Sequence, residues 1–298
     1  MDTCRRSINS ARIQTELATS YGVALEPLLR NTGITPEMLQ QPDSEIELSQ
    51  ELQLVKNLAH ATAHLPGFGL EAGKHYHLTV YGIWGFALAS SPTIRAAIDL
   101  ALRYIPLTFT LARFRLAEVN GEARIYMDDS DMPAEIRQYM LERDIAGIQN
   151  LFYEAMGTSI PLESVQFSCA EPPYAERFTA LFGRQPLFGQ AETYIAIDSC
   201  FLNMALPQAN EHTRQMCEAM CRELLQKRHA RSGLSSRIRD RLAQSPGQFP
   251  DMETVAAELH MTSRSLRRHL DSEGTSFRAL IDEIRAILAE QAIREGMT

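Results

Sequence analysis

Apolar residues recur at helical spacing through most of the first hundred residues. The pattern predicts a helix over 12–30, a second over 49–64 and a third over 93–104, the last introduced by Ser91-Pro92-Thr93. Shorter apolar stretches at 68–77 and 81–89 are interpreted as short helices. Ile34-Thr35-Pro36-Glu37 has the cap and proline that begin another short helix.

The periodicity changes after residue 107. Residues 108–119 alternate apolar and polar, Asn120-Gly121 is a tight-turn signal, and residues 122–127 provide a partner strand. Helical spacing returns over 133–156 and 174–182, and short strands are predicted at 165–169 and 194–197. This order predicts an α+β domain whose helices accompany a small, mostly antiparallel sheet.

The last ninety residues predict helices only. A long helix is expected over 208–229, followed by helices over 234–243 and from Asp251 to Leu259, by a short helix that Thr262 or Ser263 caps and that ends before Gly274, and by a longer one from Phe277 to Arg294. We therefore divide the chain into an α+β domain (1–206), a helical linker (207–231) and an all-α domain (232–298).

Two of these short helices form a helix-turn-helix pattern. Asp251 is a suitable N-cap for the first, His260-Met261-Thr262 interrupts the periodicity, and Leu266 and Leu270 form the buried stripe of the second. Gly274 stands where a left-handed residue ends a helix, and Ser276 can cap the helix that follows.

The polar face of the second helix carries candidate DNA contacts. At about 100° per residue, the arginines and one acid fall opposite the leucines. Arginine can grip guanine with both arms, and hydroxyls at a helix N-terminus hold phosphates. The alternative is an ordinary amphipathic helix with a solvated arginine face. The predicted DNA-binding residues are Thr262, Ser263, Arg264, Ser265, Arg267, Arg268, Asp271 and Ser276.

These residues also resemble a known family. Thr262-Ser263-Arg264-Ser265-Leu266-Arg267-Arg268, continued by Glu273-Gly274-Thr275-Ser276-Phe277, is similar to the first helix-turn-helix of AraC/XylS transcription regulators. Gly82-Ile83-Trp84-Gly85-Phe86 and Ser90-Ser91-Pro92-Thr93-Ile94-Arg95 resemble the branch with an arabinose-binding-type N-terminal domain. The resemblance covers most of the chain. It implies a regulator that senses a small molecule, although the family name does not imply arabinose as the ligand.

The family's DNA-binding domain has two helix-turn-helix units joined by a long helix. Residues 277–294 resemble the joining helix, and the chain ends at Thr298. The second unit is absent, so we expect either a shortened form or an unusually early natural end, and the apolar face of the joining helix favours the shortened form. We accordingly expect weak, salt-sensitive DNA binding.

The net charge of −8 is unevenly distributed. From Pro207 onward there are 14 basic and 13 acidic residues, against 15 and 24 before it. Within 226–278 the basic residues number 10 and the acidic ones 6. Basic charge is therefore local, as a DNA-binding surface requires, and the acidic part is a separate body.

The acidic body holds a weaker candidate site for a small ligand. His75, His77, Tyr81 and Trp84 combine aromatic surface with polar tips, a mixture found in pocket walls. The alternative is that Trp84 belongs to the core. The four-residue spacing of His60 and His64 could hold a metal, but no third ligand is placed nearby, so neither a metal nor a cofactor is expected.

Signatures of catalysis, secretion and membrane insertion are missing. The sequence has no phosphate-binding loop, nucleophile elbow or dinucleotide fingerprint, and its five scattered cysteines argue against a disulfide framework. We expect a cytoplasmic protein that is not an enzyme. The leading hypothesis is a homodimeric, effector-responsive, sequence-specific DNA-binding regulator. The alternative is a metabolite-binding or enzymatic α+β protein whose helical C-terminus mediates oligomerisation.

Overall fold

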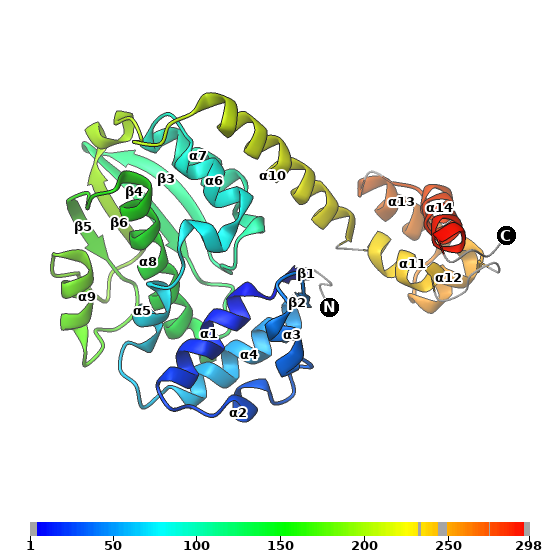
Figure 1. Ribbon diagram of the computed structural model, residues 1–298, viewed down its shortest axis with the longest axis horizontal. Helices are drawn as coiled ribbons and strands as arrows, with labels where there is room; N and C mark the ends of the chain where they lie inside the picture. The colour runs from blue at the N-terminus through cyan, green and yellow to red at the C-terminus, as the bar shows by residue number, and fades with distance from the viewer. Residues whose placement is uncertain (1–4, 232–233, 244–248, 274, 295–298) are drawn as a thin grey trace. The chain divides into compact units, whose positions relative to one another are not determined.

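The computed structural model describes residues 5–231, 234–243, 249–273 and 275–294 (Figure 1). The chain separates into two compact units. The larger is built from Arg6–Ile46 and Gln50–Leu225, and the second includes the segment from Gln226 onward. The larger unit mixes helices with a small sheet and the C-terminal segment is helical, which confirms the predicted fold class.

The first part of the larger unit is a group of short helices. The helix predicted over 12–30 is two helices, because the chain turns at Tyr21–Ala24, where Gly22 has a φ of +83°. Thr35 caps the third helix as predicted, accepting a hydrogen bond from the backbone N–H of Met38. The elements are β1 (Arg5–Ser7), α1 (Asn9–Ser20), α2 (Leu25–Leu29), α3 (Pro36–Gln40), β2 (Glu45–Glu47) and α4 (Leu48–Ala61), with β1 paired to β2.

A four-stranded antiparallel sheet forms the second part. Its strand order is β3-β4-β6-β5, and the predicted turn is present, with positive φ at both Asn120 and Gly121. The first strand is shorter than the predicted 108–119, since its pairing begins only at Arg113. The 3-10 helix η2 (Ile105–Leu107) precedes it. The strands are β3 (Arg113–Val119), β4 (Glu122–Asp128), β5 (Leu162–Gln166) and β6 (Thr193–Asp198).

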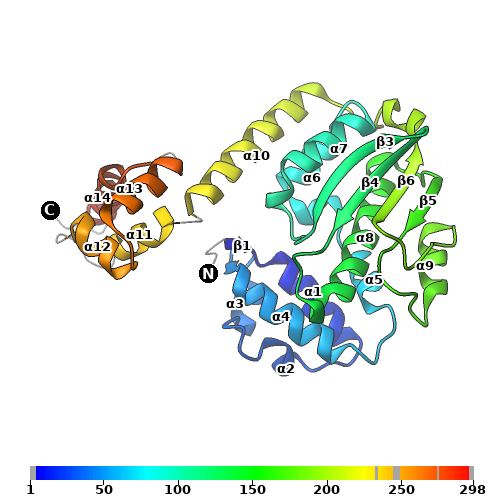
Figure 2. The ribbon, with the colours of Figure 1, turned by 180° about the vertical axis from the view of Figure 1, so that it is seen from behind.

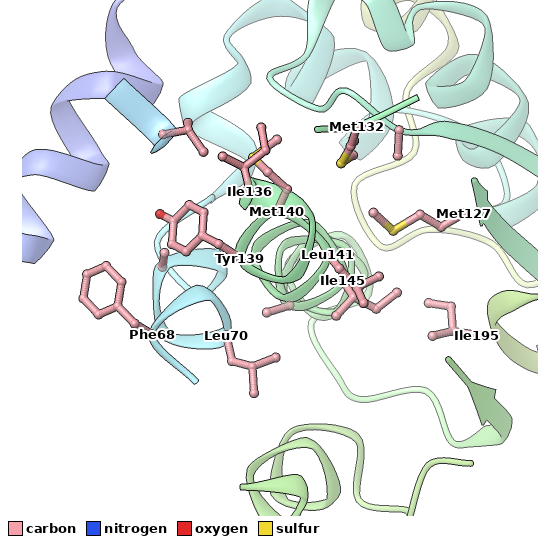
Figure 3. Packing of buried hydrophobic residues seen from close by; sticks show 14 of the residues in the cluster. Phe68, Leu70, Met127, Met132, Ile136, Tyr139, Met140, Leu141, Ile145 and Ile195 are labelled. Atoms are coloured by element: carbon pink, nitrogen blue, oxygen red, sulfur yellow. The ribbon is translucent and has the colours of Figure 1, made fainter. Parts of the chain in front are cut away.

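The helix α8 (Ala134–Met156) is the centre of the larger unit. Figure 3 shows it between the sheet, represented by Met127 and Ile195, and α5 (Phe68–Gly73). The two helices approach so closely that a Cβ on Gly73 would lie 2.4 Å from the carbonyl oxygen of Arg143. Because protein surrounds α8 on several sides, even its charged residues Glu142 and Arg143 are buried.

Further helices cover the β3 end of the sheet (Figure 2). A cluster of buried residues joins them, including Trp84 and Leu88 of α6, Leu100 of α7, and Cys217 and Cys221 of α10. The elements of this group are η1 (Leu78–Tyr81), α6 (Ile83–Ala89), α7 (Ile94–Arg103) and α10 (Glu211–Arg231), whereas α9 (Ala175–Phe182) lies beside β5 and η3 (Ser199–Asn203) follows β6.

In the described residues from 234 onward, four helices of the second unit surround one small core. The elements are α11 (Leu234–Ala243), α12 (Met252–Glu258), α13 (Ser263–Ser272) and α14 (Phe277–Arg294). The core includes Ile238, Val255, Leu266, Leu270 and Leu280, which come from all four helices. Gly274, the predicted helix-ending residue, lies outside the described residues. Among the described helices, none combines the length and apolar character needed to cross a membrane.

Candidate functional site: a helix-turn-helix face and an apolar cavity

The turn between α12 and α13 is short and fixed by backbone contacts. His260 takes a left-handed conformation with a φ of +55°, and the N–H of Met261 donates to the carbonyl of Ala256 at 2.8 Å. The Asp251 carboxylate caps α12 by accepting from Thr254 N–H at 2.8 Å. These contacts hold the two helices in the helix-turn-helix arrangement that the sequence predicted.

The two faces of α13 differ sharply. Leu266 and Leu270 are buried in the small core, whereas Arg264, Arg267 and Arg268 are exposed. Within the described part of the chain, none of these three guanidinium groups has an ion pair or a hydrogen bond. They are therefore available to an external partner while the helix is held from its other side.

Other arginines of the same unit are engaged in holding it together. Arg239 of α11 lies 2.9 Å from Glu283 of α14, and Arg241 binds Glu258 of α12 through two hydrogen bonds of 2.7 and 2.9 Å. The local excess of basic charge therefore divides into arginines that link helices and arginines that face outward from α13.

The remaining residues predicted to contact DNA lie at the ends of α13 and α14. Thr262 caps α13 by accepting from the Ser265 N–H at 3.2 Å, and Ser276 caps α14 by accepting from the N–H three residues later, also at 3.2 Å. Ser263 and Ser265 are half-buried in the first turn, and Asp271 is exposed near the C-terminal end. Two of the predicted hydroxyls thus have a structural role in addition to any contact with a ligand.

Glu273 is a structural residue that the sequence patterns did not identify. Its two carboxylate oxygens accept from the backbone N–H groups of Leu234 and Ser235 at 2.8 and 2.9 Å, so the residue after α13 caps the start of α11. Burial opposes its ionisation, yet these hydrogen bonds hold the pKa of Glu273 below its ordinary value. The stability that it contributes is present at neutral pH and is lost as the pH falls through that lowered pKa.

The larger unit contains an apolar cavity of about 130 Å³. It lies among η1, α6, α7, the first two strands of the sheet and α8. Most of its lining is aliphatic or aromatic. The lining residues are Tyr81, Trp84, Leu88, Ala97, Ile98, Ala101, Leu102, Ile105, Thr108, Thr110, Phe114, Ile125, Asp144, Ile148, Leu151, Phe152 and Ala155.

Three polar side chains of this lining are already paired. Thr110 donates its hydroxyl hydrogen to Asp144 Oδ2 at 2.5 Å, and Arg143 donates to Asp144 Oδ1 from Nε at 2.9 Å and from Nη2 at 2.7 Å. Thr108 donates to the carbonyl of Ile105 at 2.7 Å. The single carboxylate in the wall is therefore neutralised and hydrogen-bonded by the protein itself.

Tyr81 and Trp84 are the unpaired polar groups of the wall. Their rings lie 4.9 Å apart. The Trp84 indole Nε1 is buried without a hydrogen-bond partner, and within the described residues the Tyr81 hydroxyl makes no hydrogen bond. Burial raises the pKa of Tyr81 well above its usual value, so the phenol stays protonated. The Tyr81 hydroxyl can donate a hydrogen bond to a guest in the cavity, and the Trp84 indole N–H lies behind the same wall without a partner among the described residues.

The two predicted histidines lie elsewhere. His75 and His77 are exposed and do not line the cavity. His77 Nδ1 lies 2.5 Å from Oε1 of Glu154, whose other oxygen accepts from the N–H of Leu78 at 2.8 Å. The structure therefore brings Tyr81 and Trp84 together and leaves the histidines at the surface. The rest of the lining comes from elements distant in sequence, which no local pattern connects.

Comparison with known proteins assigns the family. The family model of the arabinose-binding N-terminal domain of AraC transcription regulators matches residues 22–206, which is more than half of the chain. The chain belongs to the AraC family of transcription regulators.

Relatives of this AraC-family chain extend over almost its whole length. An uncharacterized HTH-type transcriptional regulator of Mycobacterium tuberculosis is 33% identical over 302 residues, covering 99% of this chain and 87% of that protein. The ornithine utilization regulator of Pseudomonas aeruginosa is 32% identical over 278 residues, covering 93% and 81%. The crystal structure of the transcriptional regulator CdpR from Pseudomonas aeruginosa shares the fold, with a TM-score of 0.53, 22% identity and coverage of 96% and 86%.

These findings confirm the predicted family and the predicted function in transcription regulation. The family and the relatives are regulators, so the alternative of a metabolic enzyme with a helical tail is not favoured. The relatives are named as helix-turn-helix regulators, and the family model matches the larger unit. The exposed face of α13 and the cavity are therefore the two candidate sites.

Proposed function

We propose that this AraC-family regulator inserts α13 into the major groove of double-stranded DNA and changes its DNA binding when a small molecule enters the cavity of its larger unit. The observation that carries the proposal is the exposed face of α13. Arg264, Arg267 and Arg268 have no partner among the described residues, while Leu266 and Leu270 fix the helix from behind.

The chemistry of the face fits both groove and backbone. Arg267 and Arg268 can make bidentate contacts to guanine or bind phosphate, and Asp271 can accept from cytosine N4. Ser263 and Ser265 lie at the helix N-terminus, where hydroxyls and backbone N–H groups bind phosphate. Base contacts give sequence preference, whereas phosphate contacts give affinity that falls with salt.

The proposal is tested by selecting duplexes from a randomised DNA library with the purified chain, and then measuring affinity for the selected duplex over a range of salt concentrations. We expect one enriched sequence motif and an affinity that falls steeply with salt. A library that returns no motif, together with no measurable affinity at low salt, would contradict DNA binding by α13.

We assign sensing to residues 1–206, linkage to 207–231 and DNA binding to 232–298. The support is that the cavity lies wholly in the first of these segments and the helix-turn-helix in the last. Between them, α10 is one uninterrupted helix from Glu211 to Arg231. Tyr81 and Trp84 are the proposed ligand contacts, since they alone among the predicted ligand residues line the cavity.

We also propose that the protein is a homodimer that pairs through α10. Met216, Met220 and Leu224 are each about half exposed and recur every four residues, so they form one apolar stripe on α10. An adjacent side of the same helix, about 100° further around from the two methionines, is buried through Cys217 and Cys221. A self-complementary stripe of this kind fits a second copy of the helix related by a two-fold axis.

Replacing Met220 by glutamate is expected to weaken this dimer, because each copy would bury a charge against an apolar partner. Sedimentation at several concentrations should show a dimer for the parent protein and a monomer for the variant at low micromolar concentration. The control is Gln226→Glu, since Gln226 is exposed on α10 at about 120° from Met220 around the helix. A parent protein that sediments as a monomer at every concentration, or equal weakening by both variants, would refute the stripe as the interface.

A further inference from the structure

The wall of the cavity offers very few free hydrogen-bonding groups. Of its polar side chains, Thr108, Thr110 and Asp144 are already bonded within the protein, whereas the Tyr81 hydroxyl and the Trp84 indole N–H have no hydrogen bond to any residue that the structure describes. A polar guest would have to leave its remaining donors and acceptors unpaired against aliphatic side chains, and each such group carries a desolvation cost.

The electrostatics of the wall disfavour a charged guest. Asp144 is the single ionisable acid among the lining residues, and Arg143 and Thr110 already compensate it. An anion would lie beside this carboxylate without a free cation, and a cation would have to compete with Arg143. Both would lose their hydration on entering an apolar cavity.

From these two features we infer that the effector is a small, uncharged and largely hydrocarbon molecule with one hydrogen-bond acceptor, which Tyr81 and Trp84 bind. The inference rests on the proposed function of the cavity and makes its ligand specific. It contrasts with the sugar in the name of the domain family, because a pentose presents a hydroxyl or ring oxygen on nearly every carbon and the wall can pair only a small part of them.

The size of the cavity sets the scale of the guest. An apolar cavity of about 150 Å³ in another protein stays dry and accepts benzene, and the cavity here measures about 130 Å³. A six-carbon ring with one polar substituent therefore matches the available space. An indole N–H and a protonated phenol are both hydrogen-bond donors, so the complementary group on the guest is an acceptor oxygen.

The protein carries its own reporter for this test. Trp84 is the only tryptophan in the chain, so intrinsic tryptophan fluorescence arises at the cavity wall. The full chain would be titrated with cyclohexanol, with cyclohexanecarboxylate at neutral pH and with L-arabinose. We expect a saturable change with cyclohexanol, at least about 10-fold weaker binding of the carboxylate because of its desolvation, and no saturable change with L-arabinose.

Two variants place the guest in the cavity. Tyr81→Phe removes one hydrogen bond and is expected to weaken cyclohexanol binding about 3- to 10-fold. Ala101→Leu adds a larger side chain to the lining and is expected to abolish binding. The control Ala134→Leu makes the same change at an exposed position at the start of α8 and should bind like the parent.

The inference is overturned if L-arabinose or the carboxylate binds more tightly than cyclohexanol, if cyclohexanol produces no saturable change, or if Ala101→Leu binds cyclohexanol like the parent. DNA binding is tested independently in each case, because the affinity of the same protein preparations for the selected duplex can also be measured. Retained DNA affinity with failed cyclohexanol binding would refute the ligand class alone, whereas loss of both would refute the regulator as proposed.

Discussion

Replacing Asp144 by asparagine is expected to destabilise the larger unit by about 3–5 kcal/mol, the usual cost of leaving a buried charge without its partner. The side chain of Arg143 is 2% exposed and that of Asp144 is 7% exposed. Burial by itself opposes the charged form of Arg143, yet Asp144 and the surrounding groups hold the pKa of Arg143 above its usual value. Arg143 therefore stays charged in the variant. Among the described residues it would keep the Phe109 carbonyl at 2.9 Å, the face of the Tyr76 ring and, in place of the carboxylate, one uncharged amide oxygen at position 144.

The measurement is urea unfolding followed by the fluorescence of Trp84, which reports the larger unit alone. The matched control is Asp131→Asn. Asp131 also pairs with an arginine, at 2.7 Å from Arg113, but both side chains are largely exposed. An exposed pair contributes about 0–1 kcal/mol. Equal effects of the two variants would mean that another group compensates Arg143.

A second outcome separates charge from packing. The double variant Arg143→Met/Asp144→Leu removes both charges, and replacing a whole buried pair by apolar residues often costs little. We therefore expect the double variant to be more stable than Asp144→Asn alone. If the double variant were less stable, the loss would reside in the hydrogen bonds to Phe109 and Thr110, not in the uncompensated charge.

Replacing both Arg267 and Arg268 by alanine is expected to lower affinity for the selected duplex by about 30-fold or more, since each arginine contact contributes about 1–3 kcal/mol. The fold should survive, because both side chains are exposed and neither has a partner among the described residues. If both arginines bind phosphates, the slope of log affinity against log salt should become shallower by about 2. If they read bases, the slope should change less and the sequence preference should relax.

The control for this experiment is Arg177→Ala/Arg184→Ala. It removes the same charge from exposed positions of the larger unit. A general electrostatic attraction would be weakened equally by both double variants, whereas contact through α13 predicts that only the first loses affinity. Binding measured by fluorescence anisotropy of labelled duplex, with circular dichroism to verify helix content, decides between these outcomes.

The local signals of the sequence predicted much of the fold. Asp251 caps the helix that it was expected to cap, and Asn120-Gly121 makes the predicted turn of the hairpin. These features depend on neighbours within a few residues, which is why a single sequence contains them. The prediction of one continuous helix across Tyr21–Ala24 was wrong. The apolar spacing continues through this stretch, but Gly22 allows the chain to turn there.

The cavity could not be derived in this way. Its lining comes from segments between residues 81 and 155, and its volume depends on side chains that meet only after folding. Trp84 and Tyr81 were identified because aromatic residues with polar tips are chemically conspicuous. Arg143 and Asp144 were not, because adjacent charges on a helix usually face water, and only the burial of α8 on several sides makes this pair internal. Glu273 was missed since its partners are 38 and 39 residues away.

The side chains that support α10 also line the cavity. Trp84 and Leu88 border the empty space, and in the same cluster they pack with Cys217 and Cys221 of α10. A guest that shifts this shared wall therefore alters the free energy with which α10 is held. Thermodynamic linkage makes this effect reciprocal. If the guest changes the affinity of the protein for a second subunit or a DNA duplex through the packing of α10, that subunit or duplex changes the affinity for the guest by the same factor.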